Sequence, residues 1–266
     1  MARGAERKAD VVSRDLLEQI VRGDLAVGSL LPREAELAAA YGVNRSVVRE
    51  AIKLLEVHRL VRPTRRLGTV VLDPMASLTP EVLRAMLVRR DAEGARVDVT
   101  VLAGLLEIRA GLDVQMAALA AERRTKADLA ALDAEVARAR TTAGDPAAFA
   151  DALAGFALQI ARATKNPLFE MMAHWNASIT SEHDVVFGTI RSATGPHIEG
   201  LAVLAEAIRR KDAEGARQLV GAFHAWATPR LLAAAELANG GASVHLRDVS
   251  RPSPKSRAAR ARSLSS

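Results

Sequence analysis

The chain has 266 residues and no cysteine, and 49% of its residues are hydrophobic although it holds only 2 Trp, 1 Tyr and 5 Phe. This length leaves room for about two domains with separate cores, and the lack of cysteine excludes disulfides and cysteine-ligated metal centres. The formal net charge is +6, and no stretch reaches the ~20 apolar residues of a membrane-spanning helix, so we expect a cytoplasmic protein with no membrane partner.

The first 74 residues contain three predicted helices followed by a β-hairpin. After an arm over residues 1–9 that we expect to be flexible, apolar residues recur at helical spacing from Asp10. A second, short helix ends at Gly42, and Asn44 is placed to cap a third. The β-rich runs "RLVRP" and "GTVVL" then flank the segment "TRRL". This order of elements over residues 10–74 predicts a winged helix-turn-helix, which binds DNA.

The third helix of this domain has a predicted basic face. Val48, Ile52 and Leu55 form its apolar side, so the cations are left on the outside. Two of those cations lie one turn apart near the helix N-terminus, where a guanidinium can bind guanine or phosphate. The outward-facing residues are Arg45, Ser46, Arg49 and Lys53. An ordinary solvated basic face is the alternative interpretation.

The predicted hairpin carries further cations. Arg62, Arg65 and Arg66 lie on its strands and tip, where a wing would meet the phosphate backbone or the minor groove. Cations on both the helix and the hairpin indicate DNA binding more specifically than either set alone.

Beyond the hairpin the sequence is rich in Ala and Leu with a helical period. We predict a linker helix over residues 75–97 and an antiparallel helical bundle over 98–240. The expected helices span residues 79–90, 98–122, 126–141, 146–164, 167–188, 196–211 and 212–238. Residues 241–266 are expected to be a disordered basic tail, because 245–266 hold 6 Lys and Arg against 1 Asp, a net charge of +5. The predicted fold is mainly α: an N-terminal winged helix-turn-helix with a small β-hairpin wing and a C-terminal antiparallel α-helical bundle.

The segment "LLPREAELAAAYGVNRSVVREAIKLLE" (Leu30 to Glu56), followed by "RLVRPTRRLGTVV", closely resembles the winged-helix domain of GntR-type bacterial transcriptional regulators. The resemblance implies that the N-terminal residues of the third helix contact DNA, with the wing around Gly68 reaching the neighbouring groove. Two residues depart from the family pattern. Ala35 stands where members often carry Arg, although Arg33 is close by, and Arg66 replaces the first Gly of Gly-x-Gly-Thr. The candidate DNA-binding residues are Arg33, Asn44, Arg45, Ser46, Arg49, Lys53, Arg65, Arg66 and Gly68.

The bundle resembles the all-helical effector and dimerisation domain, or FCD domain, of the FadR-like subgroup. The similar segments are "LLEIRAGLDVQMAALAAERRT" (Leu105 to Thr125), "ATKNPLFEMM" and "LAEAIRRKDAEGARQLV". Many such domains hold a divalent metal through one Asp and three His. The aligned positions here are Leu153, Ala157, Leu201 and Phe223, which cannot ligate a metal, so we predict no metal and no cofactor. A rearranged metal site would have to use His174, His183, His197 or His224.

Loss of the metal ligands resembles the branch of the subgroup that senses fatty acyl-CoA, for which the four apolar residues would form cavity walls; ordinary core packing is the alternative. Arg109, in Glu107-x-Arg109, matches an arginine that binds an acidic ligand in the family. Its alternative role is an ion pair with Asp113 at i+4. The candidate effector-binding residues are Arg109, Asp113, Leu153, Ala157, Trp175, Asn176, Leu201, Phe223 and Trp226.

Together these features predict a transcriptional regulator that binds a pseudo-palindromic operator in double-stranded DNA as a homodimer. A small-molecule effector in the bundle, an acyl-CoA or another organic acid, would control it. An enzyme is disfavoured, because no nucleophilic or phosphate-cradling motif is present. Two alternatives stay open: a sequence-tolerant architectural DNA-binding protein, and a metal-dependent regulator that responds to a sugar acid or other carboxylate.

Overall fold

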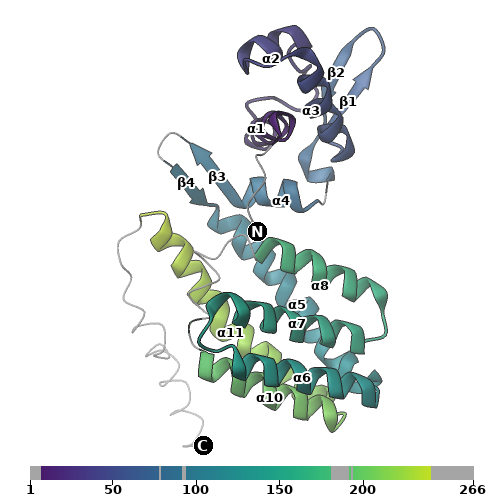
Figure 1. Ribbon diagram of the computed structural model, residues 1–266, viewed down its shortest axis with the longest axis vertical. Helices are drawn as coiled ribbons and strands as arrows, with labels where there is room; N and C mark the ends of the chain where they lie inside the picture. The colour runs from purple at the N-terminus through teal and green to yellow at the C-terminus, as the bar shows by residue number, and fades with distance from the viewer. Residues whose placement is uncertain (1–6, 78, 92–93, 181–191, 193, 241–266) are drawn as a thin grey trace, which may run out of the picture.

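The computed structural model describes residues 7–77, 79–91, 94–180, 192 and 194–240. It contains a small N-terminal head, a linker and a larger helical bundle, arranged along the long axis of the molecule (Figure 1). The predicted tail lies outside the described residues, as do the first six residues of the predicted arm. No helix in the described ranges is both long and apolar enough to cross a membrane.

The head has the predicted order of elements. It consists of α1 (Lys8–Arg22), α2 (Glu34–Ala40), α3 (Arg45–Val57), β1 (Val61–Thr64) and β2 (Gly68–Val71). Asn44 caps α3, since its side-chain oxygen accepts a hydrogen bond from the backbone N–H of Val47 at 3.0 Å. Leu16, Val48 and Leu55 are fully buried in one core. The predicted arm is too long, because α1 already begins at Lys8.

The linker differs from the predicted helix over 75–97. It contains a short 3₁₀ turn, η1 (Pro74–Ala76), and α4 (Pro80–Leu87), after which β3 (Val88–Asp91) pairs antiparallel with β4 (Gly94–Val97). The prediction of one continuous helix is therefore wrong. Helix α4 ends because Val88 is extended, with φ −121° and ψ 106°. The side chain of Asn239 holds the open end of the hairpin, where Val97 pairs with Val88. It donates to the carbonyl of Val97 and accepts from its N–H, both at 2.8 Å.

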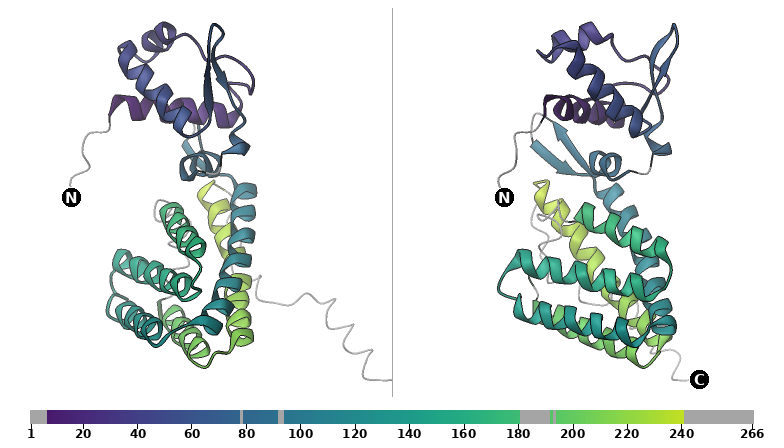
Figure 2. Two further views of the ribbon diagram at one scale, coloured as in Figure 1. Left: turned by 90° about the vertical axis from the view of Figure 1, so that its right-hand side faces the viewer. Right: turned by 45° about the vertical axis from the view of Figure 1, so that its right-hand side comes forward.

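The bundle confirms the predicted helix positions to within a few residues. Its helices are α5 (Val99–Arg123), α6 (Lys126–Thr141), α7 (Pro146–Ala163), α8 (Pro167–Thr180), α10 (Thr194–Arg209) and α11 (Ala213–Ala238). The last turns of the helix predicted over 167–188 lie outside the described residues. Helices α5 and α11 stand side by side below the head, and α6, α7 and α8 are stacked across from them (Figure 2). Side-chain caps begin several of these helices, for example Asp145, which accepts from the N–H groups of Ala147 and Ala148.

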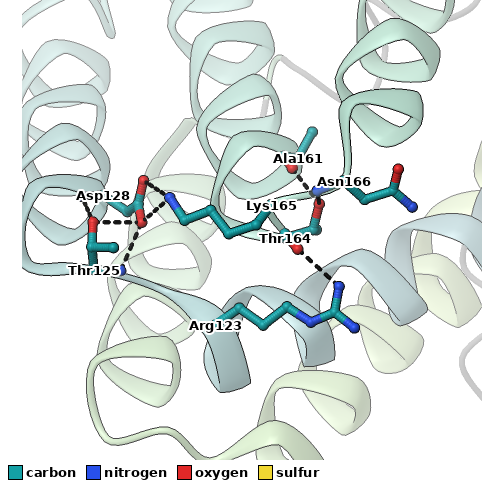
Figure 3. A network of polar contacts seen from close by, with 7 residues as sticks. All are labelled: Arg123, Thr125, Asp128, Ala161, Thr164, Lys165 and Asn166. Carbon is teal, nitrogen blue, oxygen red and sulfur yellow. Dashed lines mark hydrogen bonds and ion pairs between the residues drawn. The ribbon is translucent and has the colours of Figure 1, made fainter.

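A polar network ties three of these helices together at one corner of the bundle (Figure 3). The Lys165 ammonium, just after α7, lies 2.7 and 2.5 Å from the two carboxylate oxygens of Asp128 on α6. Asp128 also accepts hydrogen bonds from the N–H and hydroxyl of Thr125, the N-cap of α6. Arg123, at the end of α5, donates to the carbonyl of the buried Thr164 at 3.0 Å. The corner thus fixes the ends of α5, α6 and α7 relative to one another.

The charge of Asp128 makes this corner sensitive to acid. Burial alone would raise its pKa, but hydrogen bonds from Lys165 and Thr125 outweigh burial and hold the pKa below the usual range of an aspartate. Because the folded state lowers this pKa, the stabilising contribution is complete above about pH 4 and is lost as the pH falls through the lowered value.

We therefore expect Asp128→Asn to be less stable than the wild type at pH 7, by about 1 kcal/mol or less, with the difference shrinking below about pH 4. Thermal melts of both proteins across pH 2 to 7 measure this difference. Asp151→Asn, at an exposed aspartate of α7, is the control and should track the wild type. A gap between wild type and Asp128→Asn that stays constant with pH would contradict the assignment.

Candidate functional site

The N-terminal end of α3 carries the candidate DNA-reading residues. Arg45, Ser46, Arg49 and Lys53 are all exposed, as predicted, while the opposite face packs into the head. Asn44 is also exposed but is engaged in capping, since its side-chain oxygen accepts from both Val47 and the Ser46 hydroxyl. Within the described chain, Arg45 and Lys53 make no ion pair. The surface therefore offers cations that are free to meet phosphate or base edges.

Arg49 differs from its neighbours because it already has a partner. Its Nε lies 2.7 Å from the carboxylate of Glu34, the first residue of α2, and both side chains are accessible. An exposed ion pair of this kind contributes at most about 1 kcal/mol, so a guanine or a phosphate can displace Glu34. No local pattern in the sequence indicates this pair, because it joins residues of two different helices. Arg33, just before Glu34, is exposed as well.

A second contact holds α2 against α1. The Tyr41 hydroxyl donates to the Asp15 carboxylate, and the Gln19 amide donates to both of them. Burial, together with the hydrogen bond to Asp15, raises the pKa of Tyr41, so the hydroxyl stays a donor even at alkaline pH where a free tyrosine would ionise. This contact holds α2 in place, and with it Glu34 beside Arg49.

The wing carries exposed cations on strand β1 and at its tip. Arg62, Arg65 and Arg66 are all exposed, and Gly68 has a φ of 125° that disfavours any other residue. Leu67 lies between Arg66 and Gly68 in the sequence, and its side chain is 58% exposed. It was not among the predicted site residues. The sequence feature that could have identified Leu67 is the presence of an apolar residue in a turn that otherwise consists of arginines.

In the bundle, Arg109 of α5 forms the ion pair that was the alternative to ligand binding. Its Nε lies 3.3 Å from Asp113, and the Nε2 of His224 on α11 lies 3.0 Å from the same carboxylate oxygen. His224 is buried, whereas Arg109 and Asp113 are partly exposed. The Asp113 carboxylate thus accepts hydrogen bonds from Arg109 on α5 and from His224 on α11. Arg109 has further guanidinium N–H groups that do not bond to Asp113.

An aromatic group lies near this cluster on α11 and α10. Phe223 packs edge-on against both His197 and His224, with ring centroids 5.7 and 5.5 Å apart. Trp226 lies 6.1 Å from His197, and the Arg230 guanidinium sits 4.8 Å above the Trp226 ring. Phe223 remains 39% exposed. These rings can pack against the apolar part of a ligand.

The remaining predicted effector residues lie in two hydrophobic clusters or on the surface of α7. Leu153 and Leu201 pack against Phe149 as part of the core, and Ala157 is exposed on α7. Trp175, on α8, packs in the same cluster as Trp226, and Asn176 beside it is half-buried. Leu153 and Leu201 therefore fit the core-packing alternative.

The metal site of the FCD pattern does not fit this chain. The four aligned positions are apolar, and the described residues contain no group of three or more His, Asp or Glu that could hold a metal ion. His174 lies on α8 beside a hollow of about 160 Å³ lined by small residues of α7 and α8. His183 lies outside the described residues.

A helix-turn-helix with free cations on its third helix and its wing, joined to an all-helical domain, defines a winged-helix DNA-binding protein with an attached sensor. Residues 8–71 match the family model "Bacterial regulatory proteins, gntR family", and residues 104–224 match that of the FCD domain. The chain therefore belongs to the GntR family of transcriptional regulators, in the group that carries an FCD domain.

Individual relatives agree with this assignment. The chain is 28% identical over 230 residues to the galactonate operon transcriptional repressor of Escherichia coli, covering 84% of this chain and 96% of that protein. It is 34% identical over 173 residues to an uncharacterised HTH-type transcriptional regulator of Mycobacterium tuberculosis, covering 64% and 67%. The structure of Lar, which controls the expression of the Listeria monocytogenes agr system, has the same fold, with a TM-score of 0.57 at 22% identity over 86% of this chain and 98% of that one. The chain is thus a transcriptional regulator and not an enzyme.

The Arg49–Glu34 pair should limit binding to random DNA. In Glu34→Gln the side chain beside Arg49 is neutral, so Arg49 gives up no ion pair when it binds a phosphate. We therefore expect the affinity for a random duplex to rise about threefold, and the ratio of operator affinity to random-duplex affinity to fall. Fluorescence anisotropy at fixed salt measures both affinities. Glu50→Gln is the matched control, because Glu50 is an exposed carboxylate of α3 with no described ion pair. Equal changes in the two variants would show a general charge effect and contradict the role of the pair.

Proposed function

We propose that this regulator binds a pseudo-palindromic operator as a homodimer and that an organic anion in the FCD domain controls its affinity for DNA. The observation that carries the DNA part is the exposed α3 N-terminus with Arg45 and Arg49 one turn apart, beside a wing with exposed arginines. The DNA-contacting set is the nine residues that the sequence predicted.

The small size of the DNA-contacting surface of one head favours a homodimer. One α3 N-terminus spans only a few base pairs, so a single head gives limited specificity. Two heads related by a twofold axis double the contacts and match an inverted repeat in DNA. A sequence-tolerant architectural protein, the alternative, would need no such symmetry.

For the effector we favour a small carboxylate over a long acyl chain. Arg109 has guanidinium N–H groups to spare beside the buried His224, and the exposed Phe223 and the Trp226 ring supply apolar contact nearby. A carboxylate matches the guanidinium in charge and in bidentate geometry. Leu153 and Leu201, the residues aligned with an acyl cavity, already pack against Phe149. The similarity to a galactonate operon repressor supports an organic acid as well.

Control by the effector requires different affinities in two states. The ligand must bind one relative arrangement of the two heads more tightly than the other, because only a difference in affinity can shift that equilibrium. The anion would shift this equilibrium through Asp113 and His224, which connect α5 to α11.

The operator function is tested by selecting bound duplexes from a random-sequence library with the full-length protein. We expect an inverted repeat bound by two chains, with an affinity at least ~10³ times that for random duplexes. Arg49→Ala should reduce operator affinity by about 1–3 kcal/mol with an unchanged melting temperature. Gel-shift titration and sedimentation of the complex measure affinity and stoichiometry. Equal affinity for all duplexes would support the architectural alternative and overturn the operator function.

The effector proposal is tested by thermal shift with sugar acids including galactonate, short carboxylates, acyl-CoAs and divalent metals. We expect stabilisation by at least one carboxylate, lost in Arg109→Gln, because removal of the guanidinium removes the charge that binds the anion. Arg162→Gln, at an arginine paired with Glu170 at 2.8 Å, is the control and should retain the shift. Stabilisation by Zn²⁺ or Ni²⁺ that EDTA reverses would contradict a metal-free site, and a response to acyl-CoA alone would overturn the carboxylate.

A further inference from the structure

The tip of the wing combines two arginines with an exposed leucine. Strands β1 and β2 pair from Val61 with Val71 to Thr64 with Gly68, which leaves residues 65–67 as the connection. The turn is tight, since the Leu67 N–H donates to the Thr64 carbonyl at 3.1 Å. Such turns are usually built from Gly, Asn, Asp or Pro. A leucine that is 58% exposed there contributes little to the fold of the free protein.

The backbone at the tip is also strained. Arg66 has a φ of 66°, and among the described residues only Arg59, Lys165 and Lys211 share this left-handed conformation without being glycine. Those three lie two residues beyond the last residues of helices α3, α7 and α10, where a left-handed residue terminates a helix. Arg66 ends no helix. It is instead the third residue of the turn that the Thr64–Leu67 hydrogen bond closes, a position at which glycine or asparagine usually supplies a positive φ. Backbone strain of this kind, retained at an exposed arginine, is typical of binding sites.

The base of the wing, by contrast, is firmly held. Leu30 forms a β-bridge with Val70, and the N–H groups of Gly28 and Leu31 donate to the carbonyls of Val71 and Thr69 at 2.9 and 2.8 Å. The tip is therefore a short projection from a two-stranded hairpin whose strand β2 is also hydrogen-bonded to the segment of residues 28–31. A rigid support of this kind keeps a side chain at the tip in position when that side chain is pressed against another molecule.

We infer that the wing tip is a minor-groove wedge: Arg65 and Arg66 enter a narrow, A·T-rich minor groove next to the half-site, and Leu67 inserts partly between two base pairs and bends the operator. Narrow A·T-rich grooves attract arginine through their enhanced negative potential. Apolar side chains inserted at flexible pyrimidine–purine steps kink DNA by about 20–90°. This inference rests on the operator function proposed above.

Bending is measured on the duplex that the full-length wild-type protein selects from a random-sequence library, labelled with a donor and an acceptor dye at its two ends. We expect saturating wild-type protein to increase energy transfer, and Leu67→Ala to lose most of that increase while affinity falls by roughly tenfold or less. Val57→Ala is the matched control: Val57 is a 74% exposed aliphatic residue of the same head, at the opposite end of α3 from its DNA-reading residues. It should leave bending and affinity unchanged.

The outcomes separate the two proposals. Specific binding of an unbent duplex, or the same bend with Leu67→Ala as with the wild type, overturns the wedge and leaves the operator function standing. Failure of the wild type to prefer any sequence overturns both. An adenine analogue whose fluorescence rises on unstacking, placed at the pyrimidine–purine step under the tip, should brighten with the wild type and not with Leu67→Ala.

The role of Arg66 is tested by Arg66→Gly, with Arg59→Gly as the control for the loss of one positive charge and of one left-handed side chain. Both variants should melt at a higher temperature than the wild type, because glycine adopts this φ without strain. Only Arg66→Gly should lose affinity, by about tenfold, and that loss should disappear when the A·T-rich flank is replaced by G·C pairs. A loss of the same size on both flanks would indicate a phosphate contact and overturn the groove assignment.

Discussion

The structure depends on α4, a helix of two turns that belongs to two cores at once. Val82 is buried against the core of the head, whereas Leu87, less than two turns later, is buried against α5 and α11 of the bundle. Closely packed cores resist small deformations, so a shift of α4 has to be accommodated on both sides. An effector bound among the helices of the bundle can therefore alter the position of the head without touching it.

Polar contacts on α4 and on the hairpin after it add three further connections that link the linker to the head and to the bundle. At its start, Glu81 lies 3.7 Å from His58, the residue that caps the C-terminus of α3. Further along, Arg84 donates to the carbonyl of Ser178 on α8. After α4, the β3–β4 hairpin is held by Asn239, immediately beyond the last residue of α11. Since α11 also carries His224 and Trp226, the helix that faces the candidate effector site is joined to the linker by a hydrogen-bonded clamp.

Local signals explain what the sequence predicted well. Asn44, the breaks at Pro146 and Pro167, and the regular apolar spacing of the bundle helices act over one or two turns, so their pattern is visible in the sequence. The β3–β4 hairpin was missed because each strand has four residues and its stabilising partner, Asn239, lies 142 residues from Val97. For the same reason periodicity could not show that His224 shares Asp113 with Arg109 across 111 residues. The alternation of Val88 and Arg89 with Arg96 and Val97 was the one local sign of strands.

Charged side chains are paired differently on the candidate DNA-binding surface of the head and in the bundle. In the bundle, arginines such as Arg138, Arg162 and Arg209 lie within 3.3 Å of a carboxylate, which lowers their attraction for other anions. On the reading surface of the head, Arg45 and Arg65 have no such partner among the described residues. These head cations are therefore available to a polyanion, whereas those three bundle arginines are already neutralised by a carboxylate. Arg49 is an exception on this surface: because it is already paired with Glu34, a contact with DNA there has to replace an existing ion pair. On the proposed function, Arg49 therefore exchanges Glu34 only for a partner that meets its guanidinium in good geometry, such as a guanine edge with two aligned acceptors or a bidentate phosphate, and a poorly placed phosphate would not displace Glu34.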